Sequence, residues 1–272
     1  MTETRLHPRF PAASFISQQE FAEYCRQAQA RLDMRYLHES SLTTHEAVVT
    51  QHGTCAPCLR RADFATDTAG WERLPDGRRV PAWSDAQACD CEDRLTGRFR
   101  ALVHFALAEA MLRPWTRLLL FGPPGPADRR LAALAGASTR IERLLRAPGR
   151  EAVRLAAADA AFHLVVSTDY LHRVPPLRAA LSELRRVLAP GGSLVAALPF
   201  RYRATHSFSR EDVRRVAERL PVEYADPVHE LGWDVLEWLR AAGFRHAAVH
   251  SYWSNELGYL GSFNMLLHAS VE

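Results

Sequence analysis

Four cysteines form two close pairs whose spacing suits a metal ion. Cys55 and Cys58 flank an Ala-Pro dipeptide, and Cys89 and Cys91 form a second pair further along the chain. A C-x-x-C turn presents two thiolates to one centre, and a second pair completes the tetrahedron of a structural zinc site. Clustered thiols in the reducing cytosol bind metal more often than they form disulfides. We expect a structural Cys₄ zinc site, with His52 as an alternative ligand because C-x-C is an unusual spacing; unligated cysteines and a catalytic metal are the other interpretations.

Polar residues that can bind ligands or move protons follow two stretches typical of buried strands, 164–166 and 194–198. Ligands of an open α/β sheet bind beyond the carboxyl ends of its strands, so residues placed there are candidates for a site. A histidine with a pKa near neutral can take a proton from a hydroxyl or an amine. We therefore expect His172, His206 and Tyr202 to be catalytic; the alternative for each histidine is a solvated loop position. The other candidates in these loops are Ser167, Asp169 and Tyr170.

Composition narrows the classes of function. The chain has 272 residues and a formal net charge of +3, which argues against a binder that relies on electrostatic attraction to nucleic acid. All 34 basic residues are arginines, so lysine chemistry such as a Schiff base is absent. No apolar run approaches the roughly 20 residues that span a bilayer, and the N-terminus lacks the apolar core of a signal peptide. We expect a cytoplasmic protein with neither a nucleic-acid nor a membrane partner, either a monomer or a homodimer.

The segment 162–200 contains the elements that must position these residues. Its apolar run 164–166 predicts a strand buried on both faces, and 194–198 predicts another. Between them, apolar residues recur at helical spacing from 177 to 188, and Pro190-Gly191-Gly192 ends that helix and turns the chain. A strand, a crossover helix and a second strand predict a doubly wound, mostly parallel α/β sheet.

Other elements flank this crossover. Ser17 predicts the cap of a helix that runs to about His38, with Glu20 as its capping-box partner. The run 117–121 predicts the first strand of the sheet, followed by a loop at 122–126 and a helix to about 135. A second strand carries Glu142, a third lies near 151–155, and helices follow at 209–220 and 231–243. Two strands, 244–254 and 261–270, complete a domain of residues 101–272, preceded by a helical and Cys-rich module of residues 1–100.

The sequences of two segments resemble those of a known family. FHLVVSTDYLHRVP…RAALSELRRVLAPGGSLVAALPF is similar to the fourth- and fifth-strand region of class I methyltransferases that use S-adenosylmethionine (SAM). EYADP…LGWDVLEWLRAAGF…SYWSNELGYLG, with Arg98, Arg100 and Ala101, resembles a bacterial subfamily in which a Cys-rich segment precedes the core. Ala225 stands where that subfamily has histidine, and its Gly-Leu-Asn before the arginines is lost. The matching tail residues are Tyr224, Asp226, Pro227, Gly232, Trp233, Tyr252, Trp253, Gly258 and Tyr259.

The resemblance implies a SAM site and an antiparallel pair of strands at the C-terminus. The family's acidic-x-Gly-x-Gly-x-Gly loop falls on 120–126, where Gly122 is kept, Leu120 replaces the acid, and Pro124 and Pro126 replace the other glycines. Prolines lack the N–H groups that this loop uses. Expected cofactor contacts are Gly122, Pro124, Gly125, Ser167 and Asp169, with Glu142 at the ribose hydroxyls or, alternatively, as a helix-start carboxylate.

Together these observations predict a SAM-dependent methyltransferase of a small-molecule, biosynthetic substrate, with a structural zinc ion. The altered loop keeps two alternatives open. One is an enzyme of this fold that no longer transfers methyl groups, such as a cyclase or isomerase of a natural-product pathway. The other is a non-catalytic partner that scaffolds or regulates another enzyme.

Overall fold

A computed structural model describes residues 7–42, 48–67, 71–73, 79–109, 112–113, 115–135, 141–144, 154–174, 177–207 and 229–272. The predicted helix 209–220, the tail residues 224–227 and most of the predicted third strand lie outside these ranges. Leu155, the last residue of that predicted strand, is in no strand. No helix in the described ranges is long and apolar enough to cross a membrane.

A seven-stranded mixed sheet forms the centre of the fold, in the order β1-β13-β14-β10-β9-β7-β8. The four strands on the β8 side are parallel, and the other three join antiparallel, so the predicted α/β class and the C-terminal antiparallel pair are confirmed. The parallel strands are β7 (Leu118–Phe121), β8 (Ile141–Leu144), β9 (Phe162–Thr168) and β10 (Leu188–Ala197). The antiparallel strands are β1 (Ala12–Phe15), β13 (His246–Ser254) and β14 (Tyr259–Ser270).

Residues 190–192 differ from the sequence prediction. They were expected to turn the chain, but they lie inside β10, whose parallel register with β9 is interrupted between Leu188 and Ser193. Gly191 has a φ of +71°, which a residue with a side chain rarely adopts. The proline and glycines therefore produce an irregularity within the strand instead of a separate turn.

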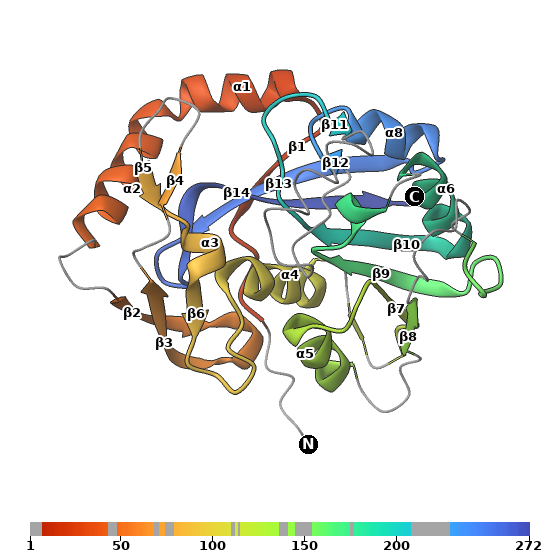
Figure 1. Ribbon diagram of the computed structural model, residues 1–272, viewed down its shortest axis with the longest axis horizontal. Coiled ribbons are helices and arrows are strands. Elements are labelled where there is room, and N and C mark those ends of the chain that lie inside the picture. The colour runs from red at the N-terminus through yellow and green to blue at the C-terminus, as the bar shows by residue number, and fades with distance from the viewer. Residues whose placement is uncertain are drawn as a thin grey trace, which may run out of the picture.

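Helices cover both faces of the main sheet (Figure 1). One face packs against α1 (Gln18–Gln27), α6 (Leu177–Val187) and α8 (Val235–Ala241), and the other against α4 (Gly97–Ala108) and α5 (Pro126–Leu134). Because apolar side chains are buried on both faces, residues 164–166 are all fully buried. The crossover predicted from the sequence is thus present, as β9, α6 and β10.

The predicted N-terminal helix is two helices. Ser17 caps α1 as expected by accepting the N–H of Glu20, but α1 ends at Gln27, and α2 (Gln29–Leu42) follows after Ala28. Phe21 of α1 stacks on Tyr202, whereas α2 packs beside β14. A bend at Ala28 lets one continuous apolar stripe cover two different surfaces.

The Cys-rich segment forms a small antiparallel sheet of β2 (Val48–Cys55), β3 (Arg60–Asp67) and β6 (Gln87–Cys89). A short helical turn, η1 (Ala56–Cys58), follows β2, and α3 (Trp83–Ala86) precedes β6. A further pair, β4 (Trp71–Arg73) and β5 (Arg79–Pro81), lies between them in the sequence. In Figure 1 this small sheet lies at the end of the molecule away from α6 and α8.

Arg100 joins the small sheet to the main sheet. Its fully buried guanidinium donates to the carbonyls of Leu257 (3.0 Å) and Gly258 (2.8 Å) in the turn between β13 and β14, and it lies 3.9 Å from the ring centre of Phe64 in β3. Because residue 100 lies inside α4 and β1 pairs with β13, the predicted boundary between residues 1–100 and 101–272 crosses shared packing. The division into two domains stays a prediction.

We expect acid to destabilise the protein, because three histidines are enclosed in the packing on or around α4. Burial lowers the pKa of His104, His250 and His268 to about 4, against an ordinary value near 6.5. Phe105 packs against His250 and His268. Like charge adds to both shifts: His268 lowers the pKa of His250, and His246 lowers the pKa of His268. The unfolded chain binds more protons between pH 6.5 and 4, so stability is present above pH 6.5 and falls as the pH drops toward 4.

Each of these histidines should contribute about 1.4 kcal/mol per pH unit to that loss. Urea unfolding at a series of pH values measures the slope. His250→Gln should reduce the slope by about that amount. An equal slope in the wild type and His250→Gln would contradict the assignment.

Candidate functional site

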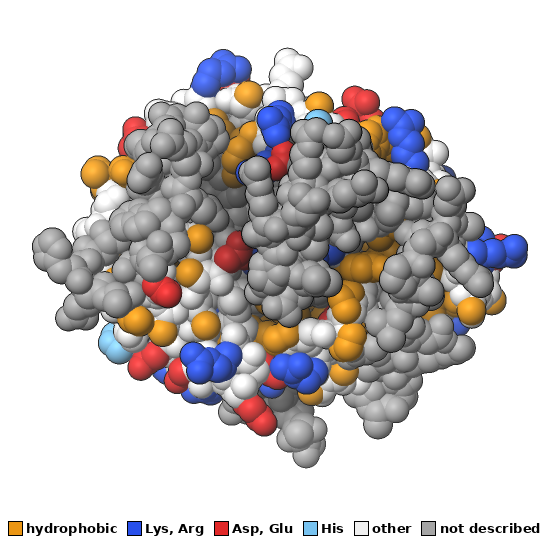
Figure 2. All heavy atoms as spheres, in the orientation of Figure 1, with side chains coloured by type: hydrophobic (Ala, Val, Ile, Leu, Met, Phe, Trp, Pro, Cys, Tyr) orange, Lys and Arg blue, Asp and Glu red, His pale blue; other side chains and the backbone are white. Residues whose placement is uncertain are grey.

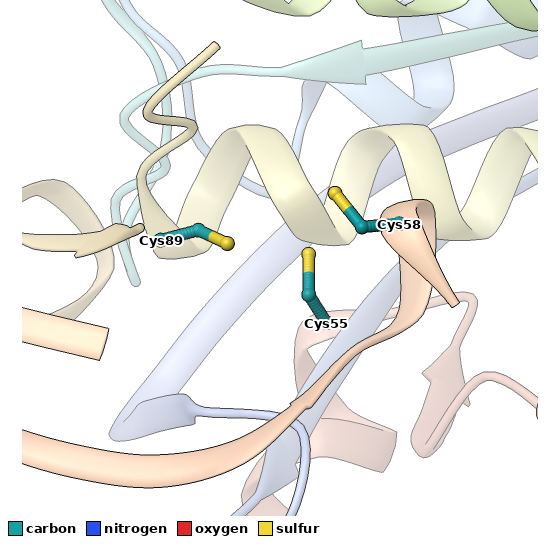
Figure 3. Close-up of side chains that lie close together, drawn as sticks. All are labelled: Cys55, Cys58 and Cys89. Carbon is teal, nitrogen blue, oxygen red and sulfur yellow. The ribbon is translucent and has the colours of Figure 1, made fainter. Parts of the chain in front are cut away.

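Three of the four paired cysteines converge in space. The sulfur atoms of Cys55, Cys58 and Cys89 all lie within 4.8 Å of one another, and Figure 3 shows them pointing toward a common centre. Cys55 ends β2, Cys58 ends η1, and Cys89 ends β6, so the pairing of these segments with β3 brings the thiols together. This cysteine cluster could hold a metal ion.

The fourth predicted ligand lies beside the cluster but not within it. The N–H of Cys91 donates to Sγ of Cys89 (3.4 Å), and Cys91 is buried in the same apolar group. Hydrogen bonds from the thiols of Cys55 and Cys89 lower the pKa of Cys58, and Cys91 contributes to that lowering. The same hydrogen bonds raise the pKa of Cys55 and of Cys89, so the metal-free cluster favours one thiolate, and zinc would displace the other two protons.

His52 is not an alternative ligand in this structure. Successive residues of β2 point to opposite faces, and His52 lies on the exposed face, away from Cys55. Its Nδ1 forms a surface hydrogen bond with the Asp63 carboxylate at 2.7 Å instead.

The loop after β7 satisfies its own polar groups. Gly125 caps α5, and its N–H donates to the buried carboxylate of Asp128 at 2.7 Å; Thr168 donates to the other oxygen of Asp128 at 3.4 Å. Pro124 is exposed and, like the other prolines of the loop, has no N–H to offer. A carboxylate of the chain itself thus takes the position near a helix N-terminus where a bound anion is favoured.

Tyr170 lies directly against Gly122. A Cβ atom added to Gly122 would lie 2.7 Å from Cβ of Tyr170, which is closer than real contacts allow, and Gly122 has a φ of +138°. The ring of Tyr170 also meets Phe121 edge-on at 5.3 Å. Asp169 adopts the left-handed region, with a φ of +52°, and carries the chain from the end of β9 into this position. The space above Gly122 therefore holds a side chain of the protein.

An arginine from α4 reaches the carboxyl end of β9. The Arg98 Nε lies 2.9 Å from Asp85 Oδ1, and its Nη1 lies 3.5 Å from Asp169 Oδ1. Arg173 Nη2 lies 3.7 Å from the second oxygen of Asp169. Burial raises the pKa of Asp85, and Arg98 opposes that shift. These four residues, named here the Arg98 cluster, connect α3 and α4 to the edge of the sheet.

Several buried polar atoms beside the Arg98 cluster have no hydrogen-bond partner among the described residues. They are Ser167 Oγ, His172 Nδ1 and the hydroxyl of Tyr252. Burial lowers the pKa of His172 to about 4, while Asp169 raises it, so the imidazole is neutral at physiological pH. Unsatisfied buried groups are costly, and two of these, Ser167 and His172, lie at or just after the carboxyl end of β9, where a ligand could satisfy them.

The other predicted site residues come from other segments of the chain, and their roles stay predictions. Tyr202 stacks on Phe21 beneath α1 at 5.7 Å, and its neighbourhood is the apolar core. His206 is exposed in β11 (His206–Ser207), which pairs with β12 (His229–Glu230). Glu142 is the second residue of β8, opposite Leu119, so it does not stand at the carboxyl end where a ribose contact was expected.

Sequence reasoning missed Asp85, Arg173 and His229. Asp85 and Arg173 belong to no recognised motif, whereas Arg98 is part of the Arg-x-Arg-Ala motif. His229 is buried near His172, accepts or donates at Ser207 Oγ (2.8 Å) and bonds the carbonyl of Val174 (3.0 Å). Sequence alone did not indicate that His229 lies near the crossover, because residues 208–228 separate the two along the chain.

Residues 129–196, from α5 into β10, match the family model described as "Methyltransferase domain". The matched segment is about a quarter of the chain, and it contains the crossover and the carboxyl end of β9. A search of curated protein sequences finds no match.

Solved structures similar to this chain are also methyltransferases by their printed descriptions. A SAM-dependent methyltransferase from Thermotoga maritima, described as a possible histamine N-methyltransferase, has 16% identity and a TM-score of 0.38 over 59% of this chain and 84% of its own. A SAM-dependent methyltransferase from Aquifex aeolicus has 16% identity and a TM-score of 0.40, with coverages of 61% and 88%. A putative methyltransferase from Bacillus halodurans has 15% identity and a TM-score of 0.39, with coverages of 64% and 98%. TM-scores of this size carry no conclusion about this chain.

Proposed function

We propose that this protein is a SAM-dependent methyltransferase of a polar small molecule that binds at the Arg98 cluster. The observation that carries the proposal is the set of unpartnered buried atoms, Ser167 Oγ and His172 Nδ1, at the carboxyl end of β9 within the matched methyltransferase segment. Carboxyl ends of parallel strands are where ligands of such sheets bind. On the described part of the face in Figure 2, acidic and basic side chains are interspersed.

The residues fit SAM with one rearrangement. Gly122 lacks a side chain at the strand end, and Ser167 and Asp169 face the same edge with hydrogen-bonding capacity to spare. Tyr170 must turn away from Gly122 before a ligand can approach the backbone there. The loop N–H of Gly125 is taken by Asp128, so the methionine end of SAM would rely on fewer backbone donors than a complete glycine loop supplies.

In this mechanism SAM supplies an electrophilic methyl group, and the protein orients the acceptor. Arg98, held between two carboxylates, keeps Asp169 in place and offers its remaining N–H groups to a polar acceptor. His172 is neutral, and its Nδ1 can accept a proton from the acceptor as the methyl group transfers. Most of the rate enhancement would come from positioning.

A second function is favoured by Asp128. Its carboxylate fills the helix N-terminus that would face the cofactor, and three prolines surround it. This supports an enzyme of methyltransferase fold that works on a substrate at the Arg98 cluster without SAM, such as a cyclase or isomerase.

Calorimetric titration with SAM and S-adenosylhomocysteine separates the two functions. The wild type should bind SAM weakly, and Tyr170→Ala should bind it about tenfold more tightly because the space above Gly122 becomes free. Tyr36→Ala, a half-buried tyrosine on α2, is the matched control and should leave the affinity unchanged. Failure of both the wild type and Tyr170→Ala to bind at millimolar SAM would remove the first function and favour the second.

A further inference from the structure

A groove outside the site described above opens between the N-terminal helices and the edge of the main sheet. It encloses about 560 Å³. Figure 1 shows α1 and α2 running past β1, the edge strand whose start forms one wall. Arginines, aromatic rings and short side chains of β1 and β13 line it, together with Phe10 and Pro11 just before β1. The arginines are Arg9, Arg31 and Arg35, and the two aromatic rings that contact them are those of Tyr24 and Trp253.

The groove carries positive charge without a compensating acid. Arg9, Arg31 and Arg35 line it, and no aspartate or glutamate does. Within the described ranges, none of these three arginines has an acidic oxygen within 4 Å of its guanidinium, although other surface arginines do. Burial lowers the pKa of Arg35, Tyr24 and Glu39 oppose that shift, and the charge of Arg31 adds to it. Like charges held together in this way are relieved by a bound anion.

Aromatic rings hold two of the guanidinium groups in place. The Arg31 guanidinium carbon lies 5.5 Å from the ring centre of Tyr24, and that of Arg35 lies 4.9 Å from the ring of Trp253. Such cation–π contacts orient an arginine without neutralising it. Arg35 also has a hydrogen bond with Tyr24, and both guanidinium groups keep their charge and further N–H donors for a ligand.

The acid nearest to this arrangement is directed elsewhere. Glu39 is fully buried, and one of its oxygens accepts the indole N–H of Trp253 at 2.7 Å and the N–H of Gly261 at 2.8 Å. Burial raises the pKa of Glu39. Glu39 thus fixes the ring on which Arg35 rests and forms no ion pair with Arg35 within 4 Å among the described residues.

We propose that this groove binds the phosphate group of a small molecule. A phosphate monoester presents three oxygens and about two negative charges, which match three forked donors better than a single carboxylate does. The proposal concerns a site distinct from the Arg98 cluster, and it stands whether or not the protein transfers methyl groups. The phosphate could be free or esterified, and the experiment distinguishes the two.

Calorimetry on the full chain at fixed ionic strength tests the site, with inorganic phosphate, pyrophosphate and phenyl phosphate as probes. We expect submillimolar binding of at least one probe and a loss of at least tenfold in Arg31→Gln and in Arg35→Gln. Arg31 is exposed, so its replacement should leave the melting temperature unchanged. Arg26→Gln is the matched control, because Arg26 is an exposed arginine on α1 that pairs with Glu23 outside the groove.

Each outcome decides the proposal. Equal binding of phosphate and phenyl phosphate supports a site for free phosphate, and tighter binding of phenyl phosphate supports a phosphate ester. The proposal is overturned if no probe binds at millimolar concentration, or if Arg31→Gln and Arg26→Gln bind equally well. Binding of single-stranded RNA without any small phosphate would also overturn it.

Discussion

Replacing Cys58 with serine should remove a metal ion and unfold the small sheet around it. The three converging thiols give the site most of its ligands, and removing one leaves two that cannot close a tetrahedral centre. Binding free energy of such a site is folding free energy, so we expect a loss of about 4 kcal/mol and a fall in Tm of roughly 10 °C. Elemental analysis should find about one zinc per wild-type chain and much less in Cys58→Ser.

The matched control is Cys25→Ser. Cys25 is half-buried on α1, outside the cysteine cluster, so its replacement should retain zinc and nearly all of the stability. Cys91→Ser tests the fourth position: loss of zinc in this variant would make Cys91 a ligand after a small movement toward the cluster. Wild-type protein that is folded and free of metal would refute the zinc site.

Replacing Gly122 with alanine should have the second large effect. At a φ of +138° a residue with a side chain is strained, and the new Cβ would collide with Tyr170 at 2.7 Å. Together these effects should cost about 2–4 kcal/mol of unfolding free energy, and they should abolish SAM binding if SAM lies over this residue. Urea unfolding and SAM calorimetry measure the two consequences separately.

Gly125→Ala is the comparison in the same loop. Gly125 is extended, and a Cβ there would meet Asp128 Oδ2 at 3.4 Å, so a shift of a few tenths of an ångström accommodates it. A double variant, Gly122→Ala with Tyr170→Ala, should recover the part of the loss due to the collision and keep the part due to φ. Similar stability of Gly122→Ala and Gly125→Ala would show that the loop is not constrained as the structure indicates.

Local pattern determined the crossover and the C-terminal strand pair. Residues 164–166 form a continuous apolar run, and the apolar residues of α6 recur at helical spacing, so these elements follow from neighbours in sequence. The C-terminal pair was predicted with similar bounds. The same patterns could not reveal that β1 would add an edge strand to β13, because pairing between residues 12 and 252 depends on which edge of the sheet is left open.

The sequence by itself determined the α/β class, the two closely spaced cysteine pairs and the strand ends that carry polar residues. Only the tertiary structure decided which of those residues meet. Arg98 of α4 reaches Asp169 after β9, Tyr170 fills the space above Gly122, and Tyr202 stacks on Phe21 of α1. The physical reason is range. Periodicity and capping act between residues a few positions apart, whereas a site is formed by side chains that packing brings together from distant segments.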